Sequence, residues 1–188
     1  ASTSSTACVA GTAVPGLIGE TPAMVRLREE IARAARTAFP VLIEGETGSG
    51  KELVARGLHA LGPRSAAAFL DVNCAALADD LVDAELFGHT KGAFTGAVGC
   101  RAGLIEQASG GTLFLDEVAD LAPRVQAKLL RALQQQEVRR VGEGRARPVD
   151  VRIVAACNRP LDEEVAAGRF RADLVFRVHA PTPPVWGR

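Results

Sequence analysis

The segment between residues 41 and 61 constrains the fold of this chain more than any other part of the sequence. A short apolar run at 41–43 leads into a glycine-rich turn, and a segment with helical periodicity follows from Lys51. Such a turn points backbone N–H groups inward, and the positive end of the helix adds to the attraction for anions. This pattern predicts a phosphate-binding loop, with Lys51 reaching the β- and γ-phosphates of a nucleotide. The predicted nucleotide-binding residues are Gly45, Glu46, Thr47, Gly48, Ser49, Gly50, Lys51 and Glu52.

Glu52 departs from the usual form of this loop. A serine or threonine normally follows the lysine, and its hydroxyl group binds Mg²⁺. Because a carboxylate stands there instead, we expect Mg²⁺ to be held by phosphate oxygens, water and a carboxylate from elsewhere in the chain.

A second buried run, at 112–115, ends in two carboxylates, Asp116 and Glu117. The carboxyl ends of strands are where parallel α/β sheets bind their ligands. We therefore expect Asp116 to organise Mg²⁺ and Glu117 to act as the base that polarises the attacking water. An acidic pair after a strand is also common in solvated turns. Only the phosphate loop upstream favours the catalytic interpretation.

Short apolar runs alternate with helical segments along the chain. The predicted fold is therefore α/β, with a parallel five-stranded sheet sandwiched by helices. The expected strands are 41–43, 69–73, 112–115, 151–156 and 177–180, and the expected helices are 22–38, 51–61, 79–87, 123–136 and 161–167. We also expect a hairpin at 137–150 and a long glycine-rich loop at 88–103.

The composition argues against several functional classes. The 22 Lys and Arg balance the 22 Asp and Glu, so a general nucleic-acid coat or a membrane-surface binder is disfavoured. The four cysteines form no Cys-x-x-Cys pair, which disfavours a metal clip or a disulfide framework. No apolar stretch is long enough to span a bilayer. We expect a reduced cytoplasmic setting without membrane contact, and a flexible leader or linker at 1–15.

Two further motifs identify a family. The runs Glu85-Leu86-Phe87-Gly88-His89 and Gly92-Ala93-Phe94-Thr95-Gly96-Ala97, with the Gly-Lys-Glu end of the phosphate loop, resemble the AAA+ domain of bacterial enhancer-binding proteins. These proteins are transcriptional activators of sigma-54 RNA polymerase. The resemblance extends from about residue 16 to residue 184. It implies a P-loop NTPase fold, ATP and Mg²⁺ as ligands, and ATPase activity. A glutamate after the P-loop lysine is usual in this family, so Glu52 agrees with it.

The resemblance also assigns roles to residues outside these motifs. Asn73 matches the residue that couples the catalytic glutamate to nucleotide state, and Asn158 matches the sensor I side chain that detects the γ-phosphate. Arg171 and Arg177 match arginine fingers, which a subunit supplies to the nucleotide of its neighbour, so the family implies a hexameric ring. Two alternatives stay open: Asn158 as a helix cap, and either arginine as a solvated surface charge.

The glycine-bounded stretch at 88–103 is expected to be an insertion that carries a contact surface. A phenylalanine and a threonine at the tip of such a loop are better explained by a partner than by the core. In the family this loop engages sigma-54 and moves with ATP hydrolysis. The predicted partner-binding residues are Gly92, Ala93, Phe94, Thr95, Gly96 and Ala97.

The sequence departs from the family at its end. Family members continue into a helical lid with a sensor II arginine and then a DNA-binding helix-turn-helix, whereas this sequence ends at Arg188. We expect an AAA+ α/β subdomain at 16–188 that stops before the lid, with no direct DNA contact from this segment. The predicted function is ATP hydrolysis that remodels the sigma-54 holoenzyme to activate transcription. Two alternatives are a non-hydrolysing nucleotide-binding or interaction remnant, and another AAA+ machine such as a chaperone, which the run at 92–97 disfavours.

Overall fold

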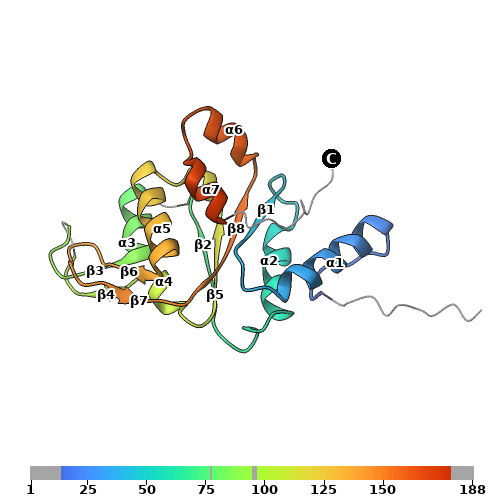
Figure 1. Ribbon diagram of the computed structural model, residues 1–188, viewed down its shortest axis with the longest axis horizontal. Helices are drawn as coiled ribbons and strands as arrows, with labels where there is room; N and C mark the ends of the chain where they lie inside the picture. The colour runs from blue at the N-terminus through green and yellow to red at the C-terminus, as the bar shows by residue number, and fades with distance from the viewer. Residues whose placement is uncertain (1–13, 77, 95–96, 179–188) are drawn as a thin grey trace, which may run out of the picture.

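A four-stranded parallel sheet forms the centre of the computed structural model, which describes residues 14–76, 78–94 and 97–178. The strands follow one another in the order β1 (Val41–Glu44), β8 (Arg152–Cys157), β5 (Thr112–Asp116) and β2 (Phe69–Asn73) (Figure 1). The register pairs Glu44 with Cys157 and Asn73 with Asp116. The carboxyl ends of the strands therefore meet at the same end of the sheet, which is where ligands bind in such folds.

Helices cover both faces of this sheet (Figure 1). One layer consists of α1 and α2, and the other is built mainly from α3, α5 and α7. None of the helices within the described ranges is long and apolar enough to cross a membrane. The helices are α1 (Pro22–Ala35), α2 (Lys51–Ala60), α3 (Asp79–Phe87), α4 (Leu104–Gln107), α5 (Pro123–Gln135), α6 (Leu161–Ala166) and α7 (Ala172–Val178), with a 3₁₀ turn η1 at Val118–Asp120.

Alternating side chains in the two central strands explain the two layers. In β5, Phe114 packs with the layer of α1 and α2, whereas Leu113 and Leu115 pack with the opposite layer. In β8, Val154 packs with the layer of α1 and α2, and Ile153 packs with the opposite layer. Both faces of these strands are buried, and for this reason the strands are visible in the sequence as continuous apolar runs.

Two small antiparallel hairpins lie beside the layer of α3 and α5. They pair β3 (Gly88–His89) with β4 (Arg101–Ala102), and β6 (Glu137–Val138) with β7 (Arg147–Pro148). The Val141 N–H donates to the Gly88 carbonyl at 2.8 Å, and the Thr90 N–H donates to the Val141 carbonyl at 3.0 Å. The expected hairpin at 137–150 is thus confirmed, and it is hydrogen-bonded to the base of the insertion at 88–103.

The predicted fifth strand at 177–180 is wrong. Arg177 and Val178 form the last turn of α7, while His179 and Ala180 lie outside the described residues. Leu174 and Val178 are both buried, and their four-residue spacing follows the period of a helix. The part of the sheet that the structure describes therefore has four strands.

Helix α1 ends three residues earlier than the apolar spacing predicts. Its last residue is Ala35, and the Thr37 hydroxyl donates to the Ala34 carbonyl at 2.9 Å. Arg152, which is almost completely buried, donates to the carbonyls of Ala34, Ala35 and Leu58 at 2.8–3.3 Å. One guanidinium group thus satisfies backbone carbonyls near the carboxyl ends of α1 and α2, which would otherwise lack partners.

Candidate nucleotide-binding site

The predicted phosphate loop connects β1 to α2. Gly48 and Gly50 have φ values of +81° and +86°, which L side chains rarely adopt. The Gly45 N–H donates to the Cys157 carbonyl at 3.1 Å, which attaches the start of the loop to the end of β8. No side chain caps the amino end of α2. The first N–H groups of this helix are therefore left for an anionic ligand.

Lys51 begins α2 and folds back over the loop. Its side chain is only 8% exposed, and its Nζ atom donates to the Gly45 carbonyl at 2.9 Å and to the Glu46 carbonyl at 3.2 Å. The same atom lies 3.5 Å from Oε1 of Glu117. A buried ammonium group needs such partners, and here they come from both predicted motifs.

Glu117 follows β5 in an unusual backbone conformation. Its φ and ψ are 51° and 48°, in the left-handed region, which costs a non-glycine residue roughly 1–2 kcal/mol. Its own N–H donates to Oδ1 of Asp116 at 3.1 Å, and its Oε2 atom accepts the backbone N–H of Asn158 at 3.0 Å. The Glu117 carboxylate is therefore fixed between the loop lysine and the end of β8.

Two buried cysteines lie close to carboxylates at this end of the sheet. Burial, reinforced by the nearby carboxylates of Asp116, Asp120 and Glu117, raises the pKa of Cys74 to about 12. Burial and the carboxylates of Glu44 and Glu117 raise the pKa of Cys157 to about 12. Several carboxylates thus lie at this end of the sheet, so a bound polyphosphate needs positive charge from Lys51 or a metal ion to offset them.

The donor groups fit Mg²⁺ only together with phosphate oxygens. Among the residues that the structure describes, no group of three or more His, Cys, Asp or Glu side chains is arranged to hold a metal ion. The Glu52 carboxylate pairs at 2.7 Å with Arg56, one turn further along α2. Asp116, at the strand end, remains the predicted protein ligand. Mg²⁺ commonly takes one or two carboxylates and completes its shell with phosphates and water.

The structure does not join Asn73 to Glu117, the predicted catalytic carboxylate. Asn73 is paired with Asp116 in the sheet, but its Oδ1 atom accepts the N–H groups of Ala75 and Ala76 at 2.9 and 3.1 Å. Within the described ranges, no hydrogen bond connects it to Glu117. It acts here as a cap of the turn after β2, and its predicted coupling role is untested.

The two predicted arginine fingers lie on α7 and in the residues that lead into it. Arg171 makes two hydrogen bonds to the Asp173 carboxylate, at 2.9 and 2.6 Å, and Arg177 donates to the Leu133 carbonyl at 2.8 Å. In the described part of the chain, neither contacts Lys51 or Glu117. An arginine that acts on a neighbouring subunit has no need of such a contact.

The insertion presents part of the predicted partner-binding run. Phe94 is 40% exposed and makes an edge-on ring contact with His89, with centroids 5.0 Å apart. The Gly92 N–H donates to the Ala97 carbonyl and the Ala97 N–H to the Phe94 carbonyl, both at 3.0 Å. Thr95 and Gly96 lie outside the described residues. A large aromatic ring is thus half-exposed on a compact turn.

Comparison with known proteins places this arrangement in a family. The family model described as "Sigma-54 interaction domain" matches residues 17–182. The chain belongs to the sigma-54 interaction domain family. It is 53% identical over 163 residues to a Nif-specific regulatory protein of Rhodobacter capsulatus, which covers 87% of this chain and 28% of that protein. It is 54% identical over 164 residues to the transcriptional regulatory protein ZraR of Salmonella typhimurium, which covers 87% of this chain and 37% of ZraR.

Solved structures have a similar fold. NtrX of Brucella abortus superimposes with a TM-score of 0.83 at 39% identity, covering 90% of this chain and 38% of NtrX. NtrX in complex with ATP matches with a TM-score of 0.82 at 38% identity, covering 91% of this chain and 37% of that chain. This sigma-54 interaction domain therefore spans about a third of the length of the relatives it matches.

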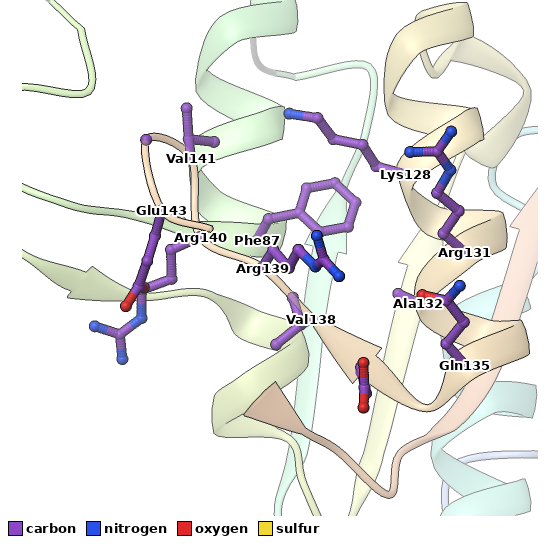
Figure 2. A pocket seen from close by; sticks show the side chains of 12 residues that line it. Phe87, Lys128, Arg131, Ala132, Gln135, Val138, Arg139, Arg140, Val141 and Glu143 are labelled. Atoms are coloured by element: carbon purple, nitrogen blue, oxygen red, sulfur yellow. The ribbon is translucent and has the colours of Figure 1, made fainter. Parts of the chain in front are cut away.

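The hairpin at 137–150 and α5 enclose a groove that is separate from the candidate nucleotide site of this sigma-54 interaction domain. It has a volume of about 370 Å³ and lies between α5 and residues 137–143. Figure 2 shows Lys128 and Arg131 projecting from α5, with Arg139 opposite, around the ring of Phe87. Lys128 is paired with both carboxylate oxygens of Asp83, at 2.9 and 2.7 Å. None of the predicted nucleotide-binding residues lines this groove.

Sequence reasoning missed two polar side chains that hydrogen-bond to backbone groups of distant segments. Oε1 of Glu44 accepts the Leu161 N–H at 3.1 Å and so caps the start of α6. Gln126, on α5, is completely buried and bonded to three backbone groups. A polar residue on the apolar face of an amphipathic helix is the only sequence signal that points to Gln126, and it does not name the partners.

Proposed function

We propose that this domain binds ATP with Mg²⁺, hydrolyses it, and uses the cycle to remodel the sigma-54 RNA polymerase holoenzyme and so activate transcription. One observation carries the proposal. The phosphate-loop lysine Lys51 and the carboxylate Glu117, which belong to motifs 66 residues apart (117 − 51), lie 3.5 Å from each other. The half-exposed Phe94 on the insertion supplies a separate surface for the partner.

The loop and Lys51 bind the triphosphate. Phosphate oxygens accept the inward N–H groups of the loop and of the first turn of α2, and they replace the Gly45 and Glu46 carbonyls as partners of Lys51. A charge-assisted bond to phosphate is stronger than a bond to a neutral carbonyl, which favours this exchange. Asp116 would hold Mg²⁺, and the bound metal ion would neutralise charge that develops on the phosphates.

Glu117 orients and polarises the attacking water. In the structure, one of its oxygens faces Lys51 and the other accepts the Asn158 N–H. When Lys51 turns to phosphate, Oε1 becomes available to accept the proton of a water, while the bond from Asn158 keeps the carboxylate in position. The Asn158 side chain, which the structure leaves exposed, is the proposed detector of the γ-phosphate.

A second subunit completes the site. Arg171 and Arg177, the two arginines that match fingers, do not reach their own subunit's Lys51 or Glu117 in the described chain. We therefore infer that they act on a neighbour's nucleotide in a ring. Such an arginine stabilises transition-state charge and contributes about 10³–10⁵ in rate in related systems.

Calorimetry and a turnover assay test the proposal together. Lys51→Ala should abolish ATP binding, whereas Glu117→Ala should retain binding and lose hydrolysis; Arg33→Ala, on the exposed face of α1, is the matched control. Phe94→Ala and Thr95→Ala should leave turnover largely intact and abolish capture of sigma-54 by the protein trapped with a transition-state analogue. ATP binding without turnover at any protein concentration would favour the non-hydrolysing alternative.

A further inference from the structure

Gln126 is a buried polar residue that the proposed chemistry does not use. It lies on α5 with no exposed surface, yet all of its hydrogen-bonding partners are backbone groups outside that helix. Its Nε2 atom donates to the Leu121 carbonyl at 2.7 Å and to the Arg169 carbonyl at 3.0 Å. Its Oε1 atom accepts the Arg171 N–H at 3.0 Å. A buried amide with this many partners fixes the segments that it joins.

The two segments joined by Gln126 have different roles. Leu121 ends the turn that begins at Glu117, since its N–H donates to the Val118 carbonyl at 3.2 Å. Arg171 lies at the start of α7, because its carbonyl accepts the N–H groups of Leu174 and Val175. One side chain thus connects the turn after the proposed catalytic carboxylate with the segment at 169–171, which leads into α7 and contains one of the two predicted arginine fingers.

An ion-pair chain runs parallel to this connection. Arg159, next to Asn158, pairs with Asp120 in the same turn after Glu117. It also lies 3.2 Å from the buried carboxylate of Glu164, which in turn accepts two hydrogen bonds from Arg169, at 2.7 and 2.8 Å. The residues on both sides of the nucleotide site, at 117–121 and 158–159, are therefore linked to the segment at 169–171 by a second route.

We propose that Gln126 is a positioning residue that fixes Arg171 and the start of α7 relative to the subunit's own Glu117 turn. This inference rests on the proposed function, because it gives the arginines a task at a neighbouring nucleotide. The position of the arginine that a subunit supplies to its neighbour then depends on whether that subunit's own site holds nucleotide. The described partners of the Gln126 side chain are backbone groups, and it acts through the backbone at 169–171.

Amide hydrogen exchange tests this coupling in the chain itself, without requiring a ring. In the wild-type protein, ATP with Mg²⁺ should slow exchange at 45–51 and also change exchange at 169–172. Gln126→Met keeps a similar volume but removes all three hydrogen bonds, so the Arg171 amide should exchange on the order of tenfold faster. The decisive readout is the nucleotide-dependent difference at 169–172, which should disappear in Gln126→Met while the protection at 45–51 persists.

Two comparisons separate coupling from general destabilisation. Gln134→Leu, an exposed glutamine on the same helix, should keep the nucleotide-dependent difference at 169–172. A merely structural role of Gln126 would raise exchange with and without ATP by the same factor, and would overturn the proposal. It would also be overturned if ATP protects 45–51 in the wild type and leaves 169–172 unchanged. Absence of any ATP effect at 45–51 would instead contradict the proposed nucleotide binding.

Turnover of mixed subunits provides an independent check. Glu117→Ala subunits bind ATP without hydrolysing it and still present Arg171, so they should restore turnover to Arg171→Ala subunits, which bind ATP normally. Gln126→Met subunits should be restored in the same way and by a similar factor. If Arg171→Ala is restored and Gln126→Met is not, the positioning role is wrong. If neither is restored, the proposed role of the arginine in a neighbouring site fails.

Discussion

The Oε2 atom of Glu117 accepts the backbone N–H of Asn158 at 3.0 Å. The predicted catalytic base is thus held by the main chain of the residue whose side chain is the predicted γ-phosphate detector. A substitution of that side chain leaves this bond in place. Positioning of the base and detection of the phosphate, although both belong to Asn158, can therefore be separated by experiment.

Asn158→Ala should lower ATP turnover without changing ATP affinity by more than about threefold. The reason is that the backbone N–H still holds Glu117, so only the side-chain contact to the reacting phosphate is lost. Steady-state kinetics gives turnover, and titration calorimetry gives affinity. An equal loss of both, or no loss of either, would contradict the separation.

Glu117→Gln should bind ATP more tightly than the wild type while turnover falls by about 10²-fold or more. The neutral amide no longer attracts Lys51, whose Nζ atom lies 3.5 Å from Oε1, so the lysine is freer to meet phosphate. Calorimetry measures the affinity, with Glu29→Gln on the exposed face of α1 as a charge-matched control. Weaker ATP binding in Glu117→Gln would show that the carboxylate organises the phosphates or Mg²⁺ directly.

Gly103→Ala should impair the function of the insertion and leave nucleotide binding intact. A Cβ atom at Gly103 would lie 2.4 Å from backbone atoms of Gly88 and Leu86, where the two ends of the insertion cross. We expect loss of sigma-54 capture with ATP affinity retained, because the clash lies at the base of the insertion and not in the phosphate loop. Gly99→Ala, where an added Cβ meets nothing within 4 Å, should behave as wild type in both assays.

Glu106→Gln should reduce stability in a pH-dependent manner. Two hydrogen bonds from Arg140, at 3.0 and 2.7 Å, hold the pKa of Glu106 below its ordinary value. A carboxyl whose pKa is lowered on folding stabilises the protein above its unfolded pKa, and this contribution is lost as the pH falls. Urea unfolding at pH 7 should show a deficit of about 1–2 kcal/mol, which shrinks toward zero near pH 3. A deficit independent of pH would indicate lost packing instead.

Among the three described cysteines, only Cys100 should react with iodoacetamide at neutral pH. It is exposed, whereas Cys74 and Cys157 are buried and have a pKa raised to about 12, so they present almost no thiolate. Peptide mass spectrometry can follow each site, and urea should expose the two buried thiols. Labelling of Cys157 as fast as Cys100 in the folded protein would mean that the end of β8 opens readily.

The parts of the site that could be predicted are those encoded by neighbours in the sequence. The glycine-rich turn before Lys51 and the two carboxylates after a buried run are each recognisable from adjacent residues. A parallel sheet brings the carboxyl ends of its strands to the same edge. The contact between Lys51 and Glu117 follows from these two facts. The family resemblance added the family assignment, which the family model confirms, and the expectation that the insertion contacts sigma-54, which stays a prediction.

The parts that could not be predicted depend on tertiary partners. The apolar residues near the end of the chain predict a strand at 177–180, whereas Leu174 and Val178 are buried residues of helix α7. Asn73 turned out to bond to the turn that follows it. Gln126 bonds to backbone groups that lie up to 45 residues away in the sequence. No local pattern in the sequence specifies such a partner.

The left-handed backbone at Glu117 has a conformational cost because a side chain stands at this position. Glycine would adopt the same φ of 51° without steric cost, but it would remove the carboxylate that pairs with Lys51 and accepts the Asn158 N–H. The backbone strain and the buried carboxylate therefore occur together, and a substitution by glycine changes both. A homologue with glycine at this position would have a relaxed backbone and, under the proposed mechanism, no hydrolysis.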